Sequence, residues 1–406
     1  MINDKILLCR EQRSKKTVEY AKNASIITLK ANVPGCEKNI PHAYLVVSYF
    51  VKLLVNKGAN LLEWFFNEDG ITVYFSCSNG EEYKKIACHL EESLPIGRLI
   101  DIDITLKGNT SSLARATPRK CFLCSNPAFI CGRNKTHTIG ELLTHFATTT
   151  ENYLQPIVAN AVKTAMEKEL SVENKFGLVT LKSNGSHKDM NATIMQKAIN
   201  AIYSLLPSAF FVGLKANNLN ILMNKLIPIG LECEKAMLTA TNQKNAYKGF
   251  IFAGGVLLAS FGYALGKGLT YQEVSSTCAK ICANLPIPTN TFGYNSYKNG
   301  FGGIRENAKN GFLSVFNAEK QLNTYSPQKI LANIVCEIED SVLLKRAGSL
   351  ENYNYYKNLI STAKEENFEN ITNLCIKNNV SIGGSADVFI CAIMMQELKK
   401  SFAFKE

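Results

Sequence analysis

The stretch 97–105, Gly-Arg-Leu-Ile-Asp-Ile-Asp-Ile-Thr, alternates apolar and polar side chains and predicts a β-strand. Every second side chain of a strand points to the same face, so Asp101 and Asp103 should lie side by side while Ile102 faces the core. Two such carboxylates repel unless a cation lies between them, which makes them candidate Mg²⁺ ligands. A solvated face of an edge strand explains the pair equally well. Arg98, which follows a glycine, adds a cation suited to phosphate.

The residues before this strand show strand and helix signals in a recurring order. We predict strands at 25–33, 60–66 and 71–77, the last two around an Asp-Gly turn, and helices at 42–57 and 81–94. Followed by the strand at 99–105, this order is the split βαβ pattern. The sequence therefore predicts an N-terminal α+β domain with a ferredoxin-like sheet.

After residue 153 strand signals nearly vanish and helical periodicity recurs. The predicted helices span 157–170, 193–206, 218–226, 230–241, 271–285, 328–344 and 352–360. The second part is therefore predicted to be all-α. A chain of 406 residues is long enough for two domains. We place their boundary between residues 147 and 173, which gives domains 1–150 and 151–406.

Two features bear on the location of the protein. The 13 cysteines are odd in number and scattered from Cys9 to Cys391, and the charged N-terminus lacks a secretory apolar segment, so we expect reduced thiols and a cytoplasmic protein. The run 249–266 has no charged side chain and approaches the length of a bilayer span. Its glycines, its lysine flanks on both sides and its isolation favour a buried core helix over a membrane segment.

The formal net charge of +11 indicates a negatively charged partner. Nucleic acid, a membrane surface, polyphosphate ligands and an acidic protein all meet that description. The lysines are dispersed, and no long basic tract with interleaved aromatic residues appears apart from the short stretch 115–120. Phosphorylated small molecules therefore fit better than nucleic acid, for which a basic groove with interleaved aromatic residues is typical.

Cysteine and histidine gather directly after that basic stretch. Cys121, Cys124, Cys131 and His137 fall within 17 residues, and three thiols with one imidazole suit a tetrahedral Zn²⁺ site. The spacing differs from that of common zinc ribbons and fingers. Ordinary buried cysteines remain an alternative interpretation.

In the helical half, four glycine-rich or polar segments each precede a predicted helix. They are 183–190, 244–249, 302–309 and 383–387. Helix N-termini present free N–H groups and the positive end of the helix dipole, so several that converge with Lys248, Arg305 and Lys309 would bind a triphosphate. Each one alone is more often a simple helix cap.

The first half resembles the citrate lyase holo-acyl-carrier-protein synthases, which are phosphoribosyl-dephospho-CoA transferases. The matching segments are Arg10-Glu11-Gln12-Arg13, Pro34-Gly35 with Lys38, 95–99 before Asp101-Ile102-Asp103, and 118–124 with Cys131 and His137. The resemblance implies a nucleotidyltransferase-type domain in which Asp101 and Asp103 hold Mg²⁺ and Arg98 and Arg13 stabilise charge. The implied partner is the acyl carrier (gamma) subunit of citrate lyase, whose serine attacks the α-phosphate and releases pyrophosphate.

The second half is similar to the triphosphoribosyl-dephospho-CoA synthases. The matching segments are 177–179, 184–185 with 187–190, 248–249, 303–306 and 383–387. The resemblance implies that the 2′-hydroxyl of dephospho-CoA attacks the anomeric carbon of ATP and expels adenine. The catalytic candidates are Glu306, Asp189 and Asp387, with His187 as the next choice. The candidates for binding nucleotide and phosphate are Lys248, Gly249, Gly303, Arg305, Lys309, Arg346, Gly383, Gly384 and Ser385.

Some positions depart from the pattern of the synthase family. Asn242, Gln243 and Tyr247 stand where the family usually has two glycines and a histidine, and Phe292 replaces another histidine. Three hypotheses follow: a bifunctional enzyme, a transferase whose helical half only binds or acts as a scaffold, and a zinc-containing nucleic-acid-binding protein. The carrier of the related malonate decarboxylase system is an alternative partner.

Overall fold

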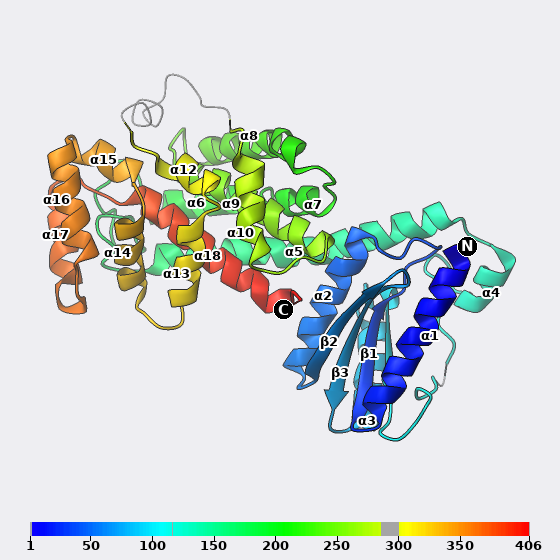
Figure 1. Cartoon of the computed structure of the whole chain (residues 1–406). Helices are drawn as coiled ribbons and strands as arrows, with labels where there is room; N and C mark the ends of the chain where they lie inside the picture. Colours follow the sequence, from blue (N-terminus) through cyan, green and yellow to red (C-terminus); the bar gives the residue numbers. More distant parts are fainter. Residues whose placement is uncertain (1, 116, 286–299, 406) are drawn as a thin grey trace. The chain divides into compact units, whose positions relative to one another are not determined.

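The computed structural model describes residues 2–115, 117–285 and 300–405. The chain divides into two compact units (Figure 1). The first contains Met1–Gln155, Leu265–Thr270 and Lys400–Glu406, and the second contains Pro156–Ala264 and Tyr271–Lys399. Phe292, one of the positions singled out in the sequence, lies outside the described residues.

The first unit is built on a four-stranded antiparallel sheet with the strand order β2-β3-β1-β4. Its elements are β1 (Ser25–Ala31), α2 (Pro41–Asn56), β2 (Asn60–Asn67), β3 (Gly70–Cys77), α3 (Gly80–Ser93) and β4 (Ile100–Thr105). This is the strand–helix–strand–strand–helix–strand order that the sequence predicts. An α+β unit followed by a mostly helical one is thereby confirmed.

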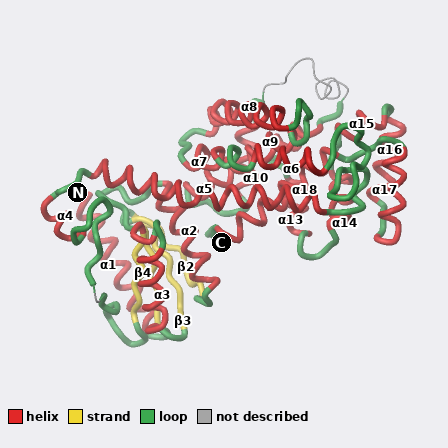
Figure 2. The backbone as a smooth tube through the Cα atoms, turned by 180° about the vertical axis from the view of Figure 1, so that it is seen from behind, coloured by secondary structure: helices red, strands yellow, loops and turns green. Residues whose placement is uncertain are grey.

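The two faces of the sheet differ in chemistry. Ile27 and Leu29 of β1, Phe75 of β3 and Ile104 of β4 have no exposed surface, and they belong to the apolar face. The other face carries polar side chains, since Lys30 of β1 pairs in register with Asp101. Figure 1 shows α1 (Ile2–Ala21) in front of the sheet, and Figure 2, from behind, shows α3 in front of it.

Helix α1 was not predicted from the sequence. It packs on the polar face through Tyr20, whose ring lies edge-on to Tyr74 of β3 with the centroids 5.5 Å apart. Ala21 and Ile26 complete this small core cluster. The sequence of α1 is mostly polar and lacks a strong amphipathic pattern, and few of its other side chains are apolar and buried. Its position matters because it brings basic side chains onto the polar face.

Two further helices follow the sheet. A short helix, α4 (Ala128–Asn134), ends at Lys135, which adopts the left-handed conformation. The next helix, α5 (Ile139–Ser171), is 33 residues long, contains Pro156 and contributes residues to both units. The helix predicted at 157–170 is therefore only its last part. Two distant segments complete the first unit: Ser48 donates a hydrogen bond to the carbonyl of Ala403 at 2.6 Å, and Thr270 bridges to Lys405.

The described residues of the second unit form helices joined by loops, with no strand among them. After α5 its α-helices are α6 (Ala192–Ile202), α7 (Ser208–Leu214), α8 (Leu222–Ala240), α9 (Lys248–Gly266), α10 (Glu273–Cys282), α12 (Gly303–Lys309), α13 (Leu313–Gln321), α14 (Pro327–Glu337), α15 (Ser341–Ala347), α16 (Leu350–Ser361), α17 (Phe368–Lys377) and α18 (Gly383–Ser401). Helix α9 is long and apolar enough to cross a membrane, but 83% of its most apolar window is buried inside the protein. Such burial is that of a core helix.

Two predicted helices have different boundaries in the structure. The single helix predicted at 328–344 is two helices, α14 and α15, because Asp340 interrupts it. The Asp340 carboxylate caps α15 by accepting hydrogen bonds from the amides of Val342 and Leu343 at 2.9 and 3.0 Å. Conversely, the two helices predicted at 218–226 and 230–241 form the continuous helix α8, preceded by a 3₁₀ turn at Leu219–Ile221, and Pro228 is accommodated within α8.

Candidate functional sites

The polar face of the first unit places the predicted aspartate pair side by side on β4, opposite Thr28 and Lys30 of β1. Asp101 is 36% exposed and pairs with Arg119. Asp103 is exposed and forms no hydrogen bond or ion pair with the described residues. The protein around Asp103 displaces part of its hydration and so raises the pKa of its carboxyl, although Lys84 and Arg13 oppose the shift. Because the Asp103 carboxylate is exposed and has no partner among the described residues, it can accept a cation.

The basic stretch near residue 119 is neutralised within the protein. Glu91 of α3 is 1% exposed and accepts hydrogen bonds from the amide of Ile102 at 2.7 Å and from Arg119 at 2.6 Å. Arg115 also pairs with Glu91. Arg119 thus links a buried glutamate to Asp101. Because acids of the protein already pair with Arg115 and Arg119, these two side chains give no support to a nucleic-acid partner.

Arg98 occupies a different environment from the aspartate pair. Its Nε donates to the carbonyl of Lys120 at 3.1 Å, and its guanidinium lies over the ring of Phe122 at 5.8 Å from the centroid. Burial, together with the charge of Arg119, lowers the pKa of Arg98. One terminal nitrogen is buried and has no hydrogen-bond partner among the described residues. That nitrogen is available to a ligand.

Arg13, predicted to act at the aspartate pair, instead forms its ion pair with Asp69. Asp69 lies in the turn between β2 and β3 and is 1% exposed. Lys30 pairs with the same carboxylate, and Arg10 does so at 3.2 Å. The sequence indicated only a turn at Asp69. Nothing local in the sequence signals this cluster, because its members come from α1, β1 and the β2–β3 turn.

The sequence prediction that Cys121, Cys124, Cys131 and His137 converge is confirmed. Their ligand atoms all lie within 4.8 Å of one another. The Cys124 sulfur is 3.5 Å from that of Cys131 and 3.4 Å from Nε2 of His137. Ligands at the Zn–S distance of about 2.3 Å in a tetrahedron are separated by about 3.8 Å, so this donor set fits Zn²⁺.

The thiols of this cluster differ in acidity. Burial alone would raise the pKa of Cys121, but hydrogen bonds from the amides of Leu123 and Cys124 bring it below the ordinary value. Burial and the neighbouring thiols raise the pKa of Cys131 to about 11. The two thiols thus differ in acidity, and a bound cation would favour the thiolate form of both.

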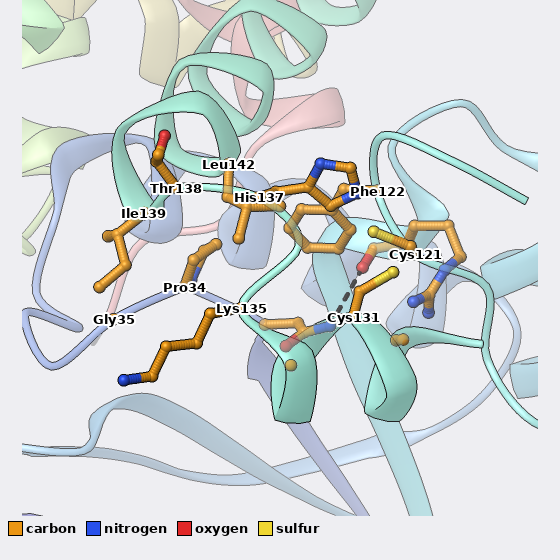
Figure 3. Close-up of a pocket in the computed structure, with 14 residues that line it drawn as sticks. Pro34, Gly35, Cys121, Phe122, Cys131, Lys135, His137, Thr138, Ile139 and Leu142 are labelled. Atoms are coloured by element: carbon orange, nitrogen blue, oxygen red, sulfur yellow. Dashed lines mark hydrogen bonds between the residues drawn. The ribbon is translucent and has the colours of Figure 1, made fainter. Parts of the chain in front are cut away.

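A pocket of about 690 Å³ adjoins the cluster, and several resemblance motifs meet there. In Figure 3 the labelled cysteines lie on one side of the pocket, and Pro34, Gly35 and Ile139 on the other. Its volume is in the usual range for a small-molecule site. The lining residues are Asn32, Pro34, Gly35, Arg98, Cys121, Phe122, Ala128, Cys131, Gly132, Lys135, His137, Thr138, Ile139 and Leu142.

In the second unit a cavity of about 150 Å³ gathers five of the predicted site residues. These are His187, Lys248, Gly249, Gly383 and Asp387. The cavity is smaller than the roughly 300 Å³ or more of a typical ligand pocket, so it would hold part of a nucleotide substrate. Lys248 lies at its edge, since its ammonium group pairs with Glu234 at 2.9 Å and is largely exposed.

Asp387 of α18 faces the first turn of α9 within this cavity. Gly249 is required there, because a Cβ at that position would collide with the Asp387 carboxylate. Burial raises the pKa of Asp387 well above its usual value, and the nearby acids Asp340 and Glu169 raise it further. This shift favours the protonated carboxyl of Asp387, which is the form that a general acid needs.

His187 lies in the same cavity, where its surroundings disfavour the protonated imidazole. Burial, and next the positive charge of Arg346, lower the pKa of His187 to about 4. Arg346 donates to Nδ1 of this imidazole at 2.8 Å and to the carbonyl of Ser186 at 3.0 Å. With Nδ1 accepting, the neutral ring carries its proton on Nε2. Arg346 thereby holds His187 in one tautomer.

Tyr247, at the start of α9, lines the same cavity and is 2% exposed. Its hydroxyl is buried and has no hydrogen-bond partner among the described residues. Burial raises the pKa of Tyr247 well above its usual value, so the hydroxyl stays protonated. Sequence reasoning treated this residue only as a departure from the family pattern. The structure adds it to the candidate site as a neutral donor.

Other predicted residues of the second unit have protein partners or lie elsewhere. The amide of Gly384 and the amide and hydroxyl of Ser385 donate to Asp340 at 3.2, 2.8 and 2.9 Å, so a carboxylate already occupies these donors. Asp189 is exposed beside Lys244 at 3.3 Å. Glu306 is exposed on α12, and it lies outside the lining of the cavity together with Gly303, Arg305 and Lys309.

Comparison with known proteins defines the class as transferases. Residues 156–406 match the family described as ATP:dephospho-CoA triphosphoribosyl transferase (CitG), and residues 2–153 match apo-citrate lyase phosphoribosyl-dephospho-CoA transferase (CitX). The chain belongs to the CitG family through more than half of its length, and it carries a CitX domain before that region.

Similar full-length proteins have the same arrangement. The chain is 28% identical to Protein CitXG of Leuconostoc mesenteroides subsp. cremoris, over 96% of this chain and 95% of the relative. It is 27% identical to Protein CitXG of Haemophilus influenzae, over 96% and 94%. The 2-(5''-triphosphoribosyl)-3'-dephosphocoenzyme-A synthase of Haemophilus ducreyi is 27% identical, over 68% of this chain and 99% of the relative. The chain is therefore an enzyme with a synthase unit and a transferase unit.

Proposed function

We propose that the second unit joins ATP to dephospho-CoA with release of adenine, and that the first unit transfers the product to a serine of the citrate lyase acyl carrier subunit with release of pyrophosphate. The observation that carries the synthase step is the cavity that gathers His187, Asp387, Lys248 and Gly249. The presence of both family matches on one chain supports the pair of reactions.

In the synthase step the 2′-oxygen of dephospho-CoA forms a bond to the anomeric carbon of ATP, and the bond from that carbon to adenine breaks. The leaving base needs a proton, and Asp387 is the preferred donor because its raised pKa favours the protonated form. His187 would receive a hydrogen bond from Arg346 and offer its Nε2–H to the substrate. Asp189 and Glu306 remain weaker candidates, since both are exposed.

In the transferase step we assign Asp101 and Asp103 to Mg²⁺, within a sheet of the ferredoxin-like, nucleotidyltransferase type. Asp103 is without an ion-pair partner among the described residues, and Asp101 uses one oxygen for Arg119, so the pair can still offer oxygen ligands. When bound, Mg²⁺ would neutralise phosphate charge. Arg98, with its unpartnered nitrogen beside the 690 Å³ pocket, is suited to bind a phosphate of dephospho-CoA.

We also assign a structural Zn²⁺ to Cys121, Cys124, Cys131 and His137. Four protein ligands fill a tetrahedral zinc, which is typical of a structural role. Metal content measured by plasma mass spectrometry on protein purified without chelator should give one zinc per chain. A stoichiometry near zero in folded protein would exclude this assignment.

The proposed setting is the cytoplasm, where thiols stay reduced. Carrier proteins are commonly acidic, and the net charge of +11 would attract such a partner. The carrier of a malonate decarboxylase is the alternative. Labelling of one apo-carrier and not the other by the same enzyme preparation distinguishes them.

The decisive experiment combines the protein with ATP, Mg²⁺ and dephospho-CoA, and follows adenine by chromatography. Apo-carrier is then added and its mass measured. Adenine release followed by a carrier mass increase supports both steps. If only the transferase half is active, no adenine is released, but the carrier is labelled normally when the triphosphoribosyl product is supplied. This alternative is tested because Tyr247 stands where the synthase family usually has a histidine.

A further inference from the structure

Four basic side chains surround one buried carboxylate on the polar face of the first unit. Asp69 is ion-paired with Arg10, Arg13 and Lys30. Lys38 lies beside the same turn, since a Cβ on Gly70 would be only 3.1 Å from the Cβ of Lys38, and the negative charge of Asp69 acts on its ammonium group. We call these five residues the Asp69 cluster.

The cluster has more positive charge than its carboxylate neutralises. Four cations face Asp69, and two acids near them have other partners: Glu63 accepts from Lys16 and Tyr20, both at 2.6 Å, and Asp101 pairs with Arg119. Asp103, which Arg13 also reaches, offsets one further positive charge and still leaves a surplus of basic side chains. One cation is enough to neutralise one carboxylate. The surplus indicates that an anion belongs to this place.

The acidity of the two lysines agrees with that surplus. Burial, followed by repulsion from Arg13, lowers the pKa of Lys30 to about 8, although Asp69 opposes the shift. Burial and then Arg10 lower the pKa of Lys38 as well. A second anion beside these lysines would reverse both effects.

The Asp69 cluster adjoins the aspartate pair. Lys30 is the cross-strand neighbour of Asp101, so both side chains lie on the same face of the sheet. Arg13 acts electrostatically on Asp103 while it pairs with Asp69. A ligand with its α-phosphate at the aspartates would therefore extend its terminal phosphates toward the cluster.

We propose that Arg10, Arg13, Lys30 and Lys38 form the diphosphate site of the transferase unit, with Asp69 positioning their side chains. This inference rests on the proposed transfer reaction. There the carrier serine oxygen bonds to the α-phosphorus, the bond from that phosphorus to the bridging oxygen breaks with its electron pair leaving on the diphosphate, and the serine proton passes to solvent. The cluster stabilises the charge that develops on the departing diphosphate.

The test measures binding of inorganic pyrophosphate to the full chain by calorimetry, without added divalent metal. Wild type should bind it, Lys30→Met should weaken binding by about tenfold or more, and the half-exposed Arg10→Gln by roughly threefold to tenfold. Lys16→Met is the matched control, because Lys16 is on α1 and faces the sheet but pairs with Glu63. It removes the same charge and should leave the affinity unchanged.

Equal affinity in wild type, Lys30→Met and Arg10→Gln would overturn the proposal, as would no binding by wild type. If only the second unit binds pyrophosphate, the affinity is equal in wild type and in both variants, which also overturns the proposal. If Lys30→Met fails to fold, Arg10→Gln decides. Asp101→Asn separates the two ideas: it should stop carrier labelling while it retains metal-free pyrophosphate binding. Normal labelling by that variant refutes the Mg²⁺ assignment and leaves the diphosphate site standing.

Discussion

The polar sheet face of the first unit and the cavity of the second unit handle charge in opposite ways. On the sheet face, Asp69 and Asp101 form ion pairs with Arg13 and Arg119, which come from other segments of the chain. In the cavity, burial raises the pKa of Asp387 and lowers that of His187, which favours the uncharged form of each. A phosphate transfer needs fixed charges, whereas departure of a nucleobase needs a movable proton. The sheet face of the first unit therefore suits phosphate transfer, and the cavity of the second unit suits departure of the nucleobase.

The largest expected effect tests whether the two regions act separately. Asp387→Asn should lower adenine release by about 10²–10⁴-fold, because an amide cannot deliver the proton. Carrier labelling from supplied triphosphoribosyl product should be unchanged in the same variant. Asp101→Asn should show the reverse pattern in both assays. Equal losses of both activities in either variant would contradict separate roles for the two units. Circular dichroism would show whether unfolding causes such a loss.

The next effect concerns the proposed zinc. Cys124→Ser removes the thiol that lies 3.5 Å from the Cys131 sulfur and 3.4 Å from Nε2 of His137, and it should lower the melting temperature by roughly 10 °C through loss of the metal. Cys36→Ser is the control, because Cys36 is an exposed free thiol of the same unit. A melting curve for Cys124→Ser that overlays that of Cys36→Ser contradicts a structural metal.

The stability of the second unit should depend on pH through His187 in the cavity. The folded-state pKa of His187 is about 4 and the ordinary value is 6.5, so the unfolded state binds the proton more tightly. Stability from this residue is full above about pH 6.5 and is lost as the pH falls toward 4. After discounting for its partial exposure the loss is about 1–2 kcal/mol. His187→Gln should flatten this limb in denaturant titrations at pH 7 and pH 4.5, and an unchanged limb would show that other groups cause it.

The sequence predicted the local elements of the first unit well, since alternating and helical patterns mark β1, α2, β2, β3, α3 and β4 directly. Convergence of the cysteines and His137 was also predictable, because the ligands lie within one short segment. Helix α1 was missed since polar residues dominate it. Asp69 was missed as a charged centre because its partners Arg13 and Lys30 come from other elements, and burial of an acid is a tertiary property.

The same limit applies to the second unit. The glycine-rich helix openings predicted anion sites, yet Asp340 satisfies the amides of Gly384 and Ser385. A motif shows that donors are present, but only the fold shows whether protein already occupies them. The protonation of Asp387 depends on α9 and α18 meeting at Gly249, which the local sequence does not encode.

The smallest effect concerns Tyr247, whose buried hydroxyl is unpartnered among the described residues. A donor buried without a partner costs about 1–3 kcal/mol, so Tyr247→Phe should raise the free energy of unfolding by about 1 kcal/mol. If the hydroxyl binds substrate, the same variant should raise KM for ATP or dephospho-CoA by roughly threefold to tenfold while kcat changes little. A destabilised variant would mean that the hydroxyl is already satisfied, for instance by water. Higher stability with an unchanged KM would assign Tyr247 to packing alone, and it would leave Asp387 and His187 as the groups through which this cavity differs from the charged sheet face.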